Sequence, residues 1–452
     1  MQSYTVREWE KLAYGDEDGQ IPAHFADQLA VLAGRSPFAG RGGSGVLEHG
    51  RHALRARGVV GILAAGRCSL EILPKIDVAA EEPVEKQNAA IRKRLIHMLA
   101  VALNLKIDLG SITELAWQRE TLLEILIRIF CDKLTEAVRK GMPRRYVEQE
   151  DDLSALRGRL DVARQFTRHA VNPSRLACRF DVLSEDTSLN RIMKAAVLHL
   201  SRMSRGSGNQ QRLRELAFVY ADIADISPSA LRWDDVVIDR TNRRWRELLS
   251  MARLFLEGRY QTTTGGAGQG TALLFEMNTL FEEYVGRLIS RALAGTDLTV
   301  SLQGGRLFCL SADSTERGLF QTKPDILIRR AGTVTHVIDT KWKRISSRID
   351  DPKQGVSQGD IYQMMAYAQL YRAPRLTLLY PHHPGLGATE LVHARHRITG
   401  HQTILETASI DVANGRSVLD RLRSLLLEDE PVSTDIPQVA CGLAAGSPEF
   451  AI

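Results

Sequence analysis

Two β-prone segments in the C-terminal third carry two acids and a lysine, and they constrain this chain more than any other feature. Residues 322–328 read Thr-Lys-Pro-Asp-Ile-Leu-Ile and residues 336–341 read His-Val-Ile-Asp-Thr-Lys, with a Gly-containing turn between them. Because side chains alternate along a strand, Asp339 and Lys341 must point to the same side. Two acids can hold a divalent cation, so the pattern is typical of a metal-dependent phosphodiesterase.

Basic side chains surround this pair of acids. Between Gln321 and Arg348 the acidic residues are Asp325 and Asp339 alone. The basic residues in the same interval are Lys323, Arg329, Arg330, Lys341, Lys343, Arg344 and Arg348. A polyanionic substrate would fit such a surface, and a solvated strand and loop would show the same composition.

The composition is that of a soluble globular protein. The 452 residues are enough for two or three domains, and neither the 44% hydrophobic content nor the net charge of +5 is unusual. The apolar runs are too short to span a bilayer, and no secretory signal begins the chain. No Cys-x-x-Cys pair occurs among Cys68, Cys131, Cys178, Cys309 and Cys441. We therefore expect a cytoplasmic protein without a zinc ribbon, a disulfide framework or a membrane partner.

Residues 1–110 are predicted to form a β-rich N-terminal domain. Residues 59–63 and 70–74 read as a hairpin that ends at a proline. The glycine-rich stretch 41–45 before it lacks the Lys-Ser/Thr of a phosphate-binding loop, so we expect a flexible loop and no nucleotide bound by this chain.

Residues 111–261 are predicted to form a mostly helical middle region. Apolar residues recur at spacings of three and four from Leu122 to Val138, and Gly141 follows as a helix stop. Further helices are expected around 192–203 and 242–255.

A Thr- and Gly-rich stretch at 262–270 is the best linker in the chain, and residues 271–430 are expected to form a further domain. This domain would begin with an amphipathic helix at 273–293, followed by the two acid-bearing strands. Its remaining elements are a helix near 360–371, a strand at 376–381 and a helix at 417–427. Residues 431–452 are rich in Gly, Pro and Ala, a composition that favours a poorly ordered tail.

This order of elements matches the core of the PD-(D/E)xK nuclease fold. The predicted fold class is therefore α/β (α+β), with a mixed sheet flanked by helices in the C-terminal domain. In that fold Asp325, Asp339 and the carbonyl of Thr340 would ligate one or two Mg²⁺ ions. Lys341 would orient or help deprotonate the attacking water and offset the charge of the transition state.

The helix after the strands carries Gln363 and Tyr367 four residues apart, and hence on one face. A Gln-x-x-x-Tyr pair accompanies the RecB-like branch of these nucleases, where it supports the metal site and the substrate strand. A Gln and a Tyr that pack an amphipathic helix on the sheet would give the same spacing.

The helix before the strands offers Glu276, Glu282 and Glu283 as a further acid near the metal. We choose Glu282 as both catalytic residue and metal ligand, because the tightest apolar pattern surrounds it and an acid there is costly without a partner. A solvated helix glutamate is the alternative for each of the three.

Several motifs in combination make the chain resemble the McrC family. They are the run 277–285 (Met-Asn-Thr-Leu-Phe-Glu-Glu-Tyr-Val), Pro324-Asp325, Asp339-Thr340-Lys341 and the run 360–367 (Asp-Ile-Tyr-Gln-Met-Met-Ala-Tyr). Weaker similarity extends upstream through 70–76, 156–160 and 187–191, so that it covers most of the chain up to about Pro381.

The resemblance implies a Mg²⁺-dependent DNA endonuclease subunit of a modification-dependent restriction system. Its partners would be double-stranded, modified DNA and hexamers of an McrB-like AAA+ GTPase whose hydrolysis it stimulates. The stretch 41–75 would be the docking element, with Arg51, Arg55 or Arg57 reaching the partner. A non-catalytic DNA-binding adaptor and an autonomous RecB-like repair nuclease stay open as alternatives.

Overall fold

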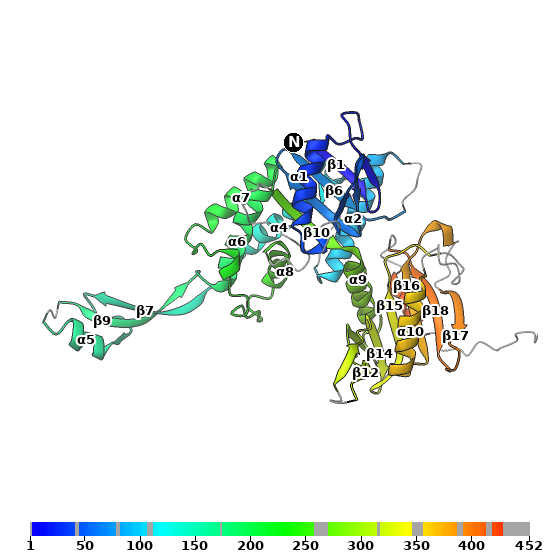
Figure 1. The fold of residues 1–452 in the computed structure, drawn as a ribbon. Helices are drawn as coiled ribbons and strands as arrows, with labels where there is room; N and C mark the ends of the chain where they lie inside the picture. Colours follow the sequence, from blue (N-terminus) through cyan, green and yellow to red (C-terminus); the bar gives the residue numbers. More distant parts are fainter. Residues whose placement is uncertain are drawn as a thin grey trace, which may run out of the picture.

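The computed structural model describes residues 2–40, 45–77, 82–105, 112–171, 174–256, 270–313, 317–345, 356–386, 392–412 and 418–427. The chain is a mixed α/β protein, as the sequence predicted. An N-terminal sheet packs beside a group of helices, an arm projects from these helices, and a second sheet forms the C-terminal part (Figure 1). The predicted linker, except Gly270, and the predicted tail lie outside the described residues.

The N-terminal sheet has the strand order β1-β6-β5-β10. Its strands are β1 (Gln2–Arg7), β5 (Val59–Ala65), β6 (Cys68–Leu73) and β10 (Gly270–Glu276). The predicted hairpin is confirmed, because β5 and β6 pair antiparallel around a turn in which Gly66 has a φ of 57°. Helix α1 (Ala23–Gly34) packs on this sheet, and a small sheet of β2 (Lys11–Ala13), β3 (Leu47–His49) and β4 (Ala53–Ala56) flanks it.

The start of the predicted 273–293 helix is wrong. Residues up to Glu276 form β10, which pairs antiparallel with β5 from Gly270 to Glu276, and helix α9 begins only at Met277 (Met277–Ala292). The apolar run in β10 suits a buried strand as well as a helix, and the free side of β5 decides between them. The chain passes from the N-terminal sheet into α9 without an intervening loop, where the Met277 N–H donates to the Gly58 carbonyl at 3.2 Å.

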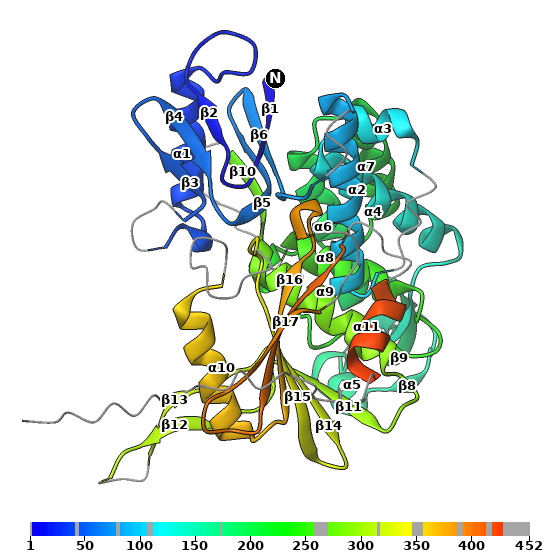
Figure 2. The ribbon, with the colours of Figure 1, turned by 90° about the vertical axis from the view of Figure 1, so that its right-hand side faces the viewer.

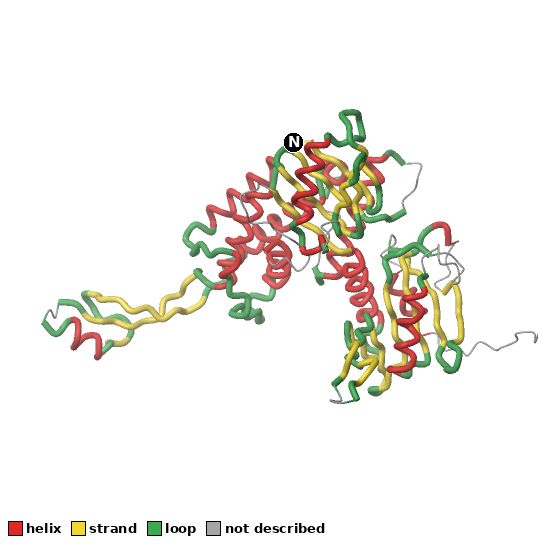
Figure 3. The backbone as a smooth tube through the Cα atoms, viewed as in Figure 1, coloured by secondary structure: helices red, strands yellow, loops and turns green. Residues whose placement is uncertain are grey.

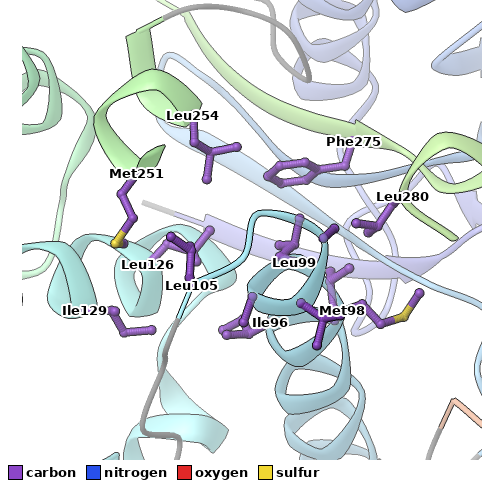
Figure 4. Close-up of a cluster of buried hydrophobic side chains, with 14 of the residues drawn as sticks. Ile96, Met98, Leu99, Leu105, Leu126, Ile129, Met251, Leu254, Phe275 and Leu280 are labelled. Carbon is purple, nitrogen blue, oxygen red and sulfur yellow. The ribbon is translucent and has the colours of Figure 1, made fainter. Parts of the chain in front are cut away.

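The middle region contains a packed group of helices, and those predicted around 122–138, 192–203 and 242–255 are confirmed as α4 (Leu122–Arg139), α6 (Ser188–Met203) and α8 (Trp245–Leu256). The group also contains α3 (Glu114–Arg119), α7 (Ser207–Val219) and α2 (Val84–Ala102), which comes from the region predicted to be β-rich. Their apolar faces share one core with β10 and α9, to which Leu99, Leu126 and Phe275 belong (Figure 4).

A buried ion pair joins the N-terminal sheet to these helices. The Arg92 Nη2 atom of α2 lies 2.7 Å from Glu71 Oε2 of β6, and the two residues are only 6% and 1% exposed. Glu71 Oε1 also accepts a hydrogen bond from the Leu122 N–H at the start of α4, while Arg92 donates to the Trp117 carbonyl. The pair therefore fixes the sheet, α2 and α4 to one another.

The arm interrupts the predicted helical region. It consists of β7 (Arg145–Leu153), β8 (Arg159–Leu160), helix α5 (Val162–Arg168) and β9 (Leu176–Ser184), and Figures 1 and 3 show it projecting away from the helices. Its strands are held by cross-strand charge pairs such as Glu150 and Arg179, whose atoms lie 2.6 Å apart. Most of β7 is exposed, so it lacks the apolar alternation that reveals a strand in a sequence.

The C-terminal sheet has six strands in the order β11-β14-β15-β16-β18-β17. They are β11 (Leu298–Leu302), β14 (Ile326–Arg330), β15 (Thr333–Thr340), β16 (Arg375–Pro381), β17 (Val392–Arg397) and β18 (Ile404–Ile410). The sheet is mixed, since β14 and β15 are antiparallel while β15, β16 and β18 are parallel. A ribbon of β12 (Phe308–Ser311) and β13 (Gly318–Gln321) lies beside it.

Helices cover both faces of this sheet. Helices α9 and α11 (Val418–Leu427) pack with Ile326, Ile338 and Leu379, whereas α10 (Gln358–Tyr371) packs with Val337 and Leu378 on the other face (Figure 2). The predicted helices near 360–371 and 417–427 and the strand at 376–381 are confirmed. None of the helices in the described ranges has the length and apolar character of a membrane span.

Candidate active site

The two acids of the opening motif meet at one end of the C-terminal sheet. Ile326, which follows Asp325, pairs with Ile338, which precedes Asp339, so the antiparallel register places both acids at the same end. Asp325 Oδ2 accepts hydrogen bonds from the N–H and the hydroxyl of Thr340, at 2.7 and 2.8 Å. Thr340, the residue between Asp339 and Lys341, thereby orients the Asp325 carboxylate.

Asp339 is fully buried and Asp325 is partly buried, and their charges interact. Burial, and then the negative charge of Asp325, raise the pKa of Asp339 to about 6. Burial also raises the pKa of Asp325, although the hydrogen bonds from Thr340 oppose this. Two carboxylates at one site favour the binding of a cation, because it removes their mutual repulsion.

Lys341 lies against Asp339, on the side that strand alternation predicted. Its Nζ atom is 2.5 Å from Asp339 Oδ2 and donates to Gln363 Oε1 at 3.2 Å. Burial alone would lower the pKa of Lys341, but the charges of Asp339 and Asp325 outweigh it and raise that pKa. The lysine therefore carries a positive charge beside the acids.

Gln363 and Tyr367 extend the site from helix α10. The Gln363 amide donates to Asp339 Oδ1 at 3.2 Å and to the Tyr367 hydroxyl at 2.8 Å. The helix is held at its start by a capping box between Ser357 and Asp360, and Asp360 also pairs with Lys343 at 3.1 Å. Gln363 and Tyr367 share one face of α10, as predicted, and Gln363 contacts Asp339 from that face.

Of the three helix acids, Glu282 is the one that interacts with the acid pair. Burial, and then the charge of Asp325, raise the pKa of Glu282 to about 7. Gln303 connects the two residues, since its amide donates to Glu282 Oε1 at 2.8 Å and its N–H to the Asp325 carbonyl at 2.7 Å. Glu276 instead precedes the first turn of α9 and accepts from the Thr279 hydroxyl.

The oxygen donors at this site suit a hard divalent cation. Within the described ranges, no three His, Cys, Asp or Glu side chains lie close enough together to hold a metal by themselves. Mg²⁺ does not require such a cage, because it keeps several waters and binds through one or two carboxylates and substrate phosphates. The carboxylates of Asp325 and Asp339 fit that mode of binding.

The N-terminal sheet reaches the segment next to Lys341. Glu8, directly after β1, is 2% exposed and accepts a hydrogen bond from Trp342 Nε1 at 2.9 Å and one from the Lys75 N–H at 3.2 Å. Burial raises the pKa of Glu8 to about 7. No local pattern in the sequence singled out Glu8, Gln303 or Trp342, because each acts through a partner far away in the chain.

We expect Glu8→Gln to change how stability depends on pH. The folded-state pKa of about 7 lies above the ordinary value of 4.5, so the folded chain binds more protons than the unfolded chain between these values. The wild-type free energy of unfolding should therefore fall, relative to Glu8→Gln, by about 3 kcal/mol as the pH rises from about 4.5 to 7. Urea unfolding across this pH range measures the difference, and parallel curves would contradict the prediction.

The predicted docking arginines lie on the small N-terminal sheet. The guanidinium groups of Arg55 and Arg57 lie over the Trp9 ring, with 5.7 and 5.4 Å to its centroid. Arg51 is exposed in the turn between β3 and β4. Their contact with a partner stays a prediction, and residues 41–44 of the docking stretch lie outside the described ranges.

Comparison with known proteins identifies the relatives of this fold. Residues 54–381 match the family model described as "McrBC 5-methylcytosine restriction system component". A relative from Escherichia coli K12, the "Type IV methyl-directed restriction enzyme EcoKMcrBC", is 22% identical over 303 residues, which cover 64% of this chain and 84% of that relative.

Two solved structures from Thermococcus gammatolerans are similar. One is described as a half-complex from a tetradecameric assembly of McrB AAA+ hexamers with bound McrC. The match has a TM-score of 0.67 at 22% identity and covers 94% of this chain and 99% of that chain. The other is the cryo-EM structure of the McrBC complex, with a TM-score of 0.50 at 26% identity, covering 65% and 88%. The first match shows that the two folds agree over nearly their whole length.

Proposed function

Because this chain belongs to the McrBC family of restriction-system components, we propose that it is the Mg²⁺-dependent, DNA-cutting subunit of such a system. One observation carries the proposal. The start of β14 and the end of β15 bring Asp325, Asp339 and Lys341 together, and Gln363 of α10 contacts both Asp339 and Lys341. The mixed sheet between α9 and α10 supports a PD-(D/E)xK arrangement for this domain.

Each side chain has a distinct task in this proposal. Asp325, Asp339 and the Thr340 carbonyl would hold the cation, with Glu282 as a further acid of the site. Bound Mg²⁺ would supply an activated water and neutralise charge on the phosphate. The Lys341 ammonium stabilises the negative charge that develops on the phosphate oxygens. Gln363, which also donates to Tyr367, holds the side chains of Lys341 and Asp339 in place.

We further propose that the chain works with a separate AAA+ ring that supplies nucleotide hydrolysis and DNA targeting. The related T. gammatolerans complex contains McrB AAA+ hexamers with bound McrC, and the present sequence has no phosphate-binding loop of its own. The family description names 5-methylcytosine, so modified double-stranded DNA in the cytoplasm is the proposed substrate.

Removal of Mg²⁺ is expected to abolish cutting by the complex of this chain with its AAA+ partner. The carboxylates of Asp325 and Asp339 repel each other without a cation, and Lys341 alone would not lower the pKa of a water as a bound metal does. Gel analysis of plasmid DNA carrying 5-methylcytosine, with and without a chelator and after Mg²⁺ is restored, measures this.

The same assay separates the alternative functions. DNA binding without cutting at any Mg²⁺ concentration would contradict the proposal and identify a non-catalytic adaptor. Cutting by this chain alone, at the rate of the complex, would instead identify an autonomous nuclease.

A further inference from the structure

The residue after the proposed catalytic lysine is held by Glu8, which follows β1 of the N-terminal sheet, and by helix α9. The Trp342 indole N–H donates to Glu8, and its backbone N–H donates to Asn278 Oδ1 at 3.3 Å. Its ring packs on Phe281, with 5.3 Å between the ring centroids. None of these three contacts comes from the C-terminal sheet itself.

The three anchors belong to one connected unit. Glu8 follows β1, and its N–H donates to the Leu73 carbonyl at the end of β6 at 2.9 Å. Asn278 and Phe281 lie in the first turns of α9, which continues directly from β10 in the same sheet. A movement of the N-terminal sheet therefore acts on Trp342 through Glu8, and through the strand that continues into α9.

Lys341 lies between this unit and the C-terminal sheet. Its backbone N–H donates to the Leu379 carbonyl of β16 at 2.9 Å. Directly afterwards, the Lys343 N–H donates to the Lys341 carbonyl at 2.9 Å, which closes a tight turn around Trp342. With so short a connection, a displacement of Trp342 shifts the backbone from which the Lys341 side chain extends.

Burial of Glu8 is costly for a residue that merely fills space. Its Oε1 atom is buried without a hydrogen-bond partner among the described residues. A buried carboxylate with an unpaired oxygen destabilises a fold, whereas an apolar side chain of similar size would pack there without this cost. The carboxylate accepts hydrogen bonds from Trp342 and from the Lys75 N–H, which an apolar side chain could not.

We propose that Glu8 is a positioning residue. Through Trp342 it holds Lys341 in place, and it makes cutting depend on the position of the N-terminal sheet. The inference rests on the proposed nuclease function and adds a regulatory contact to it. A partner that shifts the N-terminal sheet would then control the cutting site without touching it.

Trp342→Phe tests the contact, because it removes the indole N–H and keeps an aromatic ring on Phe281. In the complex with the AAA+ partner, we expect the maximal cutting rate to fall about 10–100-fold. The KM for DNA and the stimulated nucleotide hydrolysis should stay within about twofold. Glu8→Gln keeps the acceptor oxygen and should cut at close to the wild-type rate. Arg344→Ala is the matched control, since it removes an exposed ion pair with Asp77 that joins the same two regions.

Wild-type cutting by Trp342→Phe would overturn the proposal. So would a joint loss of cutting, DNA binding and nucleotide hydrolysis with a lower melting temperature, because that pattern indicates a purely structural role. Hydrogen–deuterium exchange gives a readout that needs no cutting. We expect faster exchange of the Lys341 and Lys343 amides in Trp342→Phe, and unchanged exchange contradicts the inference. Failure of the proposed function itself shows separately, as absence of cutting by the wild-type complex.

Discussion

Replacement of Lys341 by Ala is expected to reduce DNA cutting by about a thousandfold, the largest effect that any single change in this chain should have on activity. The substitution removes the ammonium group 2.5 Å from Asp339 and leaves the hydrogen bonds from Thr340 to Asp325 in place. Nucleotide hydrolysis by the AAA+ partner should still be stimulated, because Lys341 lies beside the C-terminal sheet, whereas the docking element is expected at 41–75. Parallel assays of DNA cleavage and phosphate release measure both activities.

The matched control is Arg330→Ala. Arg330 is also basic, but it is the last residue of β14, at the end away from Asp325, where it pairs with Asp297. We expect this variant to cut within about threefold of the wild type, since exposed pairs contribute little. Wild-type cutting by Lys341→Ala would show that the active site has been wrongly assigned.

Arg92→Met is expected to have the largest effect on stability, about 3–5 kcal/mol. The change leaves the Glu71 carboxylate, which is 1% exposed, without its cation, while the Leu122 N–H and the Thr5 hydroxyl still donate to it. Because Glu71 and Arg92 join the N-terminal sheet to α2 and α4, the loss should loosen the whole junction. Urea unfolding followed by circular dichroism measures the shift of the midpoint.

Two further variants make this result interpretable. Arg144→Met removes an exposed pair with Glu185 at 2.7 Å and should cost less than about 1 kcal/mol. Glu71→Leu combined with Arg92→Met removes both charges and should recover most of the loss, because no unpaired buried charge is left. Equal destabilisation by Arg92→Met and Arg144→Met would contradict a special role for the buried pair.

The parts of the fold that the sequence predicted are those with strong local patterns. Helix α4 has apolar residues at spacings of three and four, and the β5–β6 hairpin consists of two apolar runs around a turn. The acid-bearing strands lie around a turn with glycine. The same holds for the candidate site, since Asp339 with Lys341 and Gln363 with Tyr367 are each fixed by spacing within one element. Local geometry is enough to place such pairs.

What the sequence could not predict depends on contacts between distant segments. Strand β10 was mistaken for helix because its apolar run suits both structures, and only the open side of β5 selects the strand. The arm was missed because β7 is largely exposed and carries charged residues that pair with those of β9. Glu8 and Trp342 are 334 residues apart, so no window of sequence shows their contact.

The direct passage from β10 into α9 has a consequence for how chains of this family can be recombined. A nuclease cassette that begins at residue 271 would carry away the strand that completes the N-terminal sheet, and would expose the edge of β5. It would also arrive in a new host with a strand that has no place to pair. Exchange of C-terminal domains between relatives of this chain therefore requires that the N-terminal sheet and α9 are transferred together.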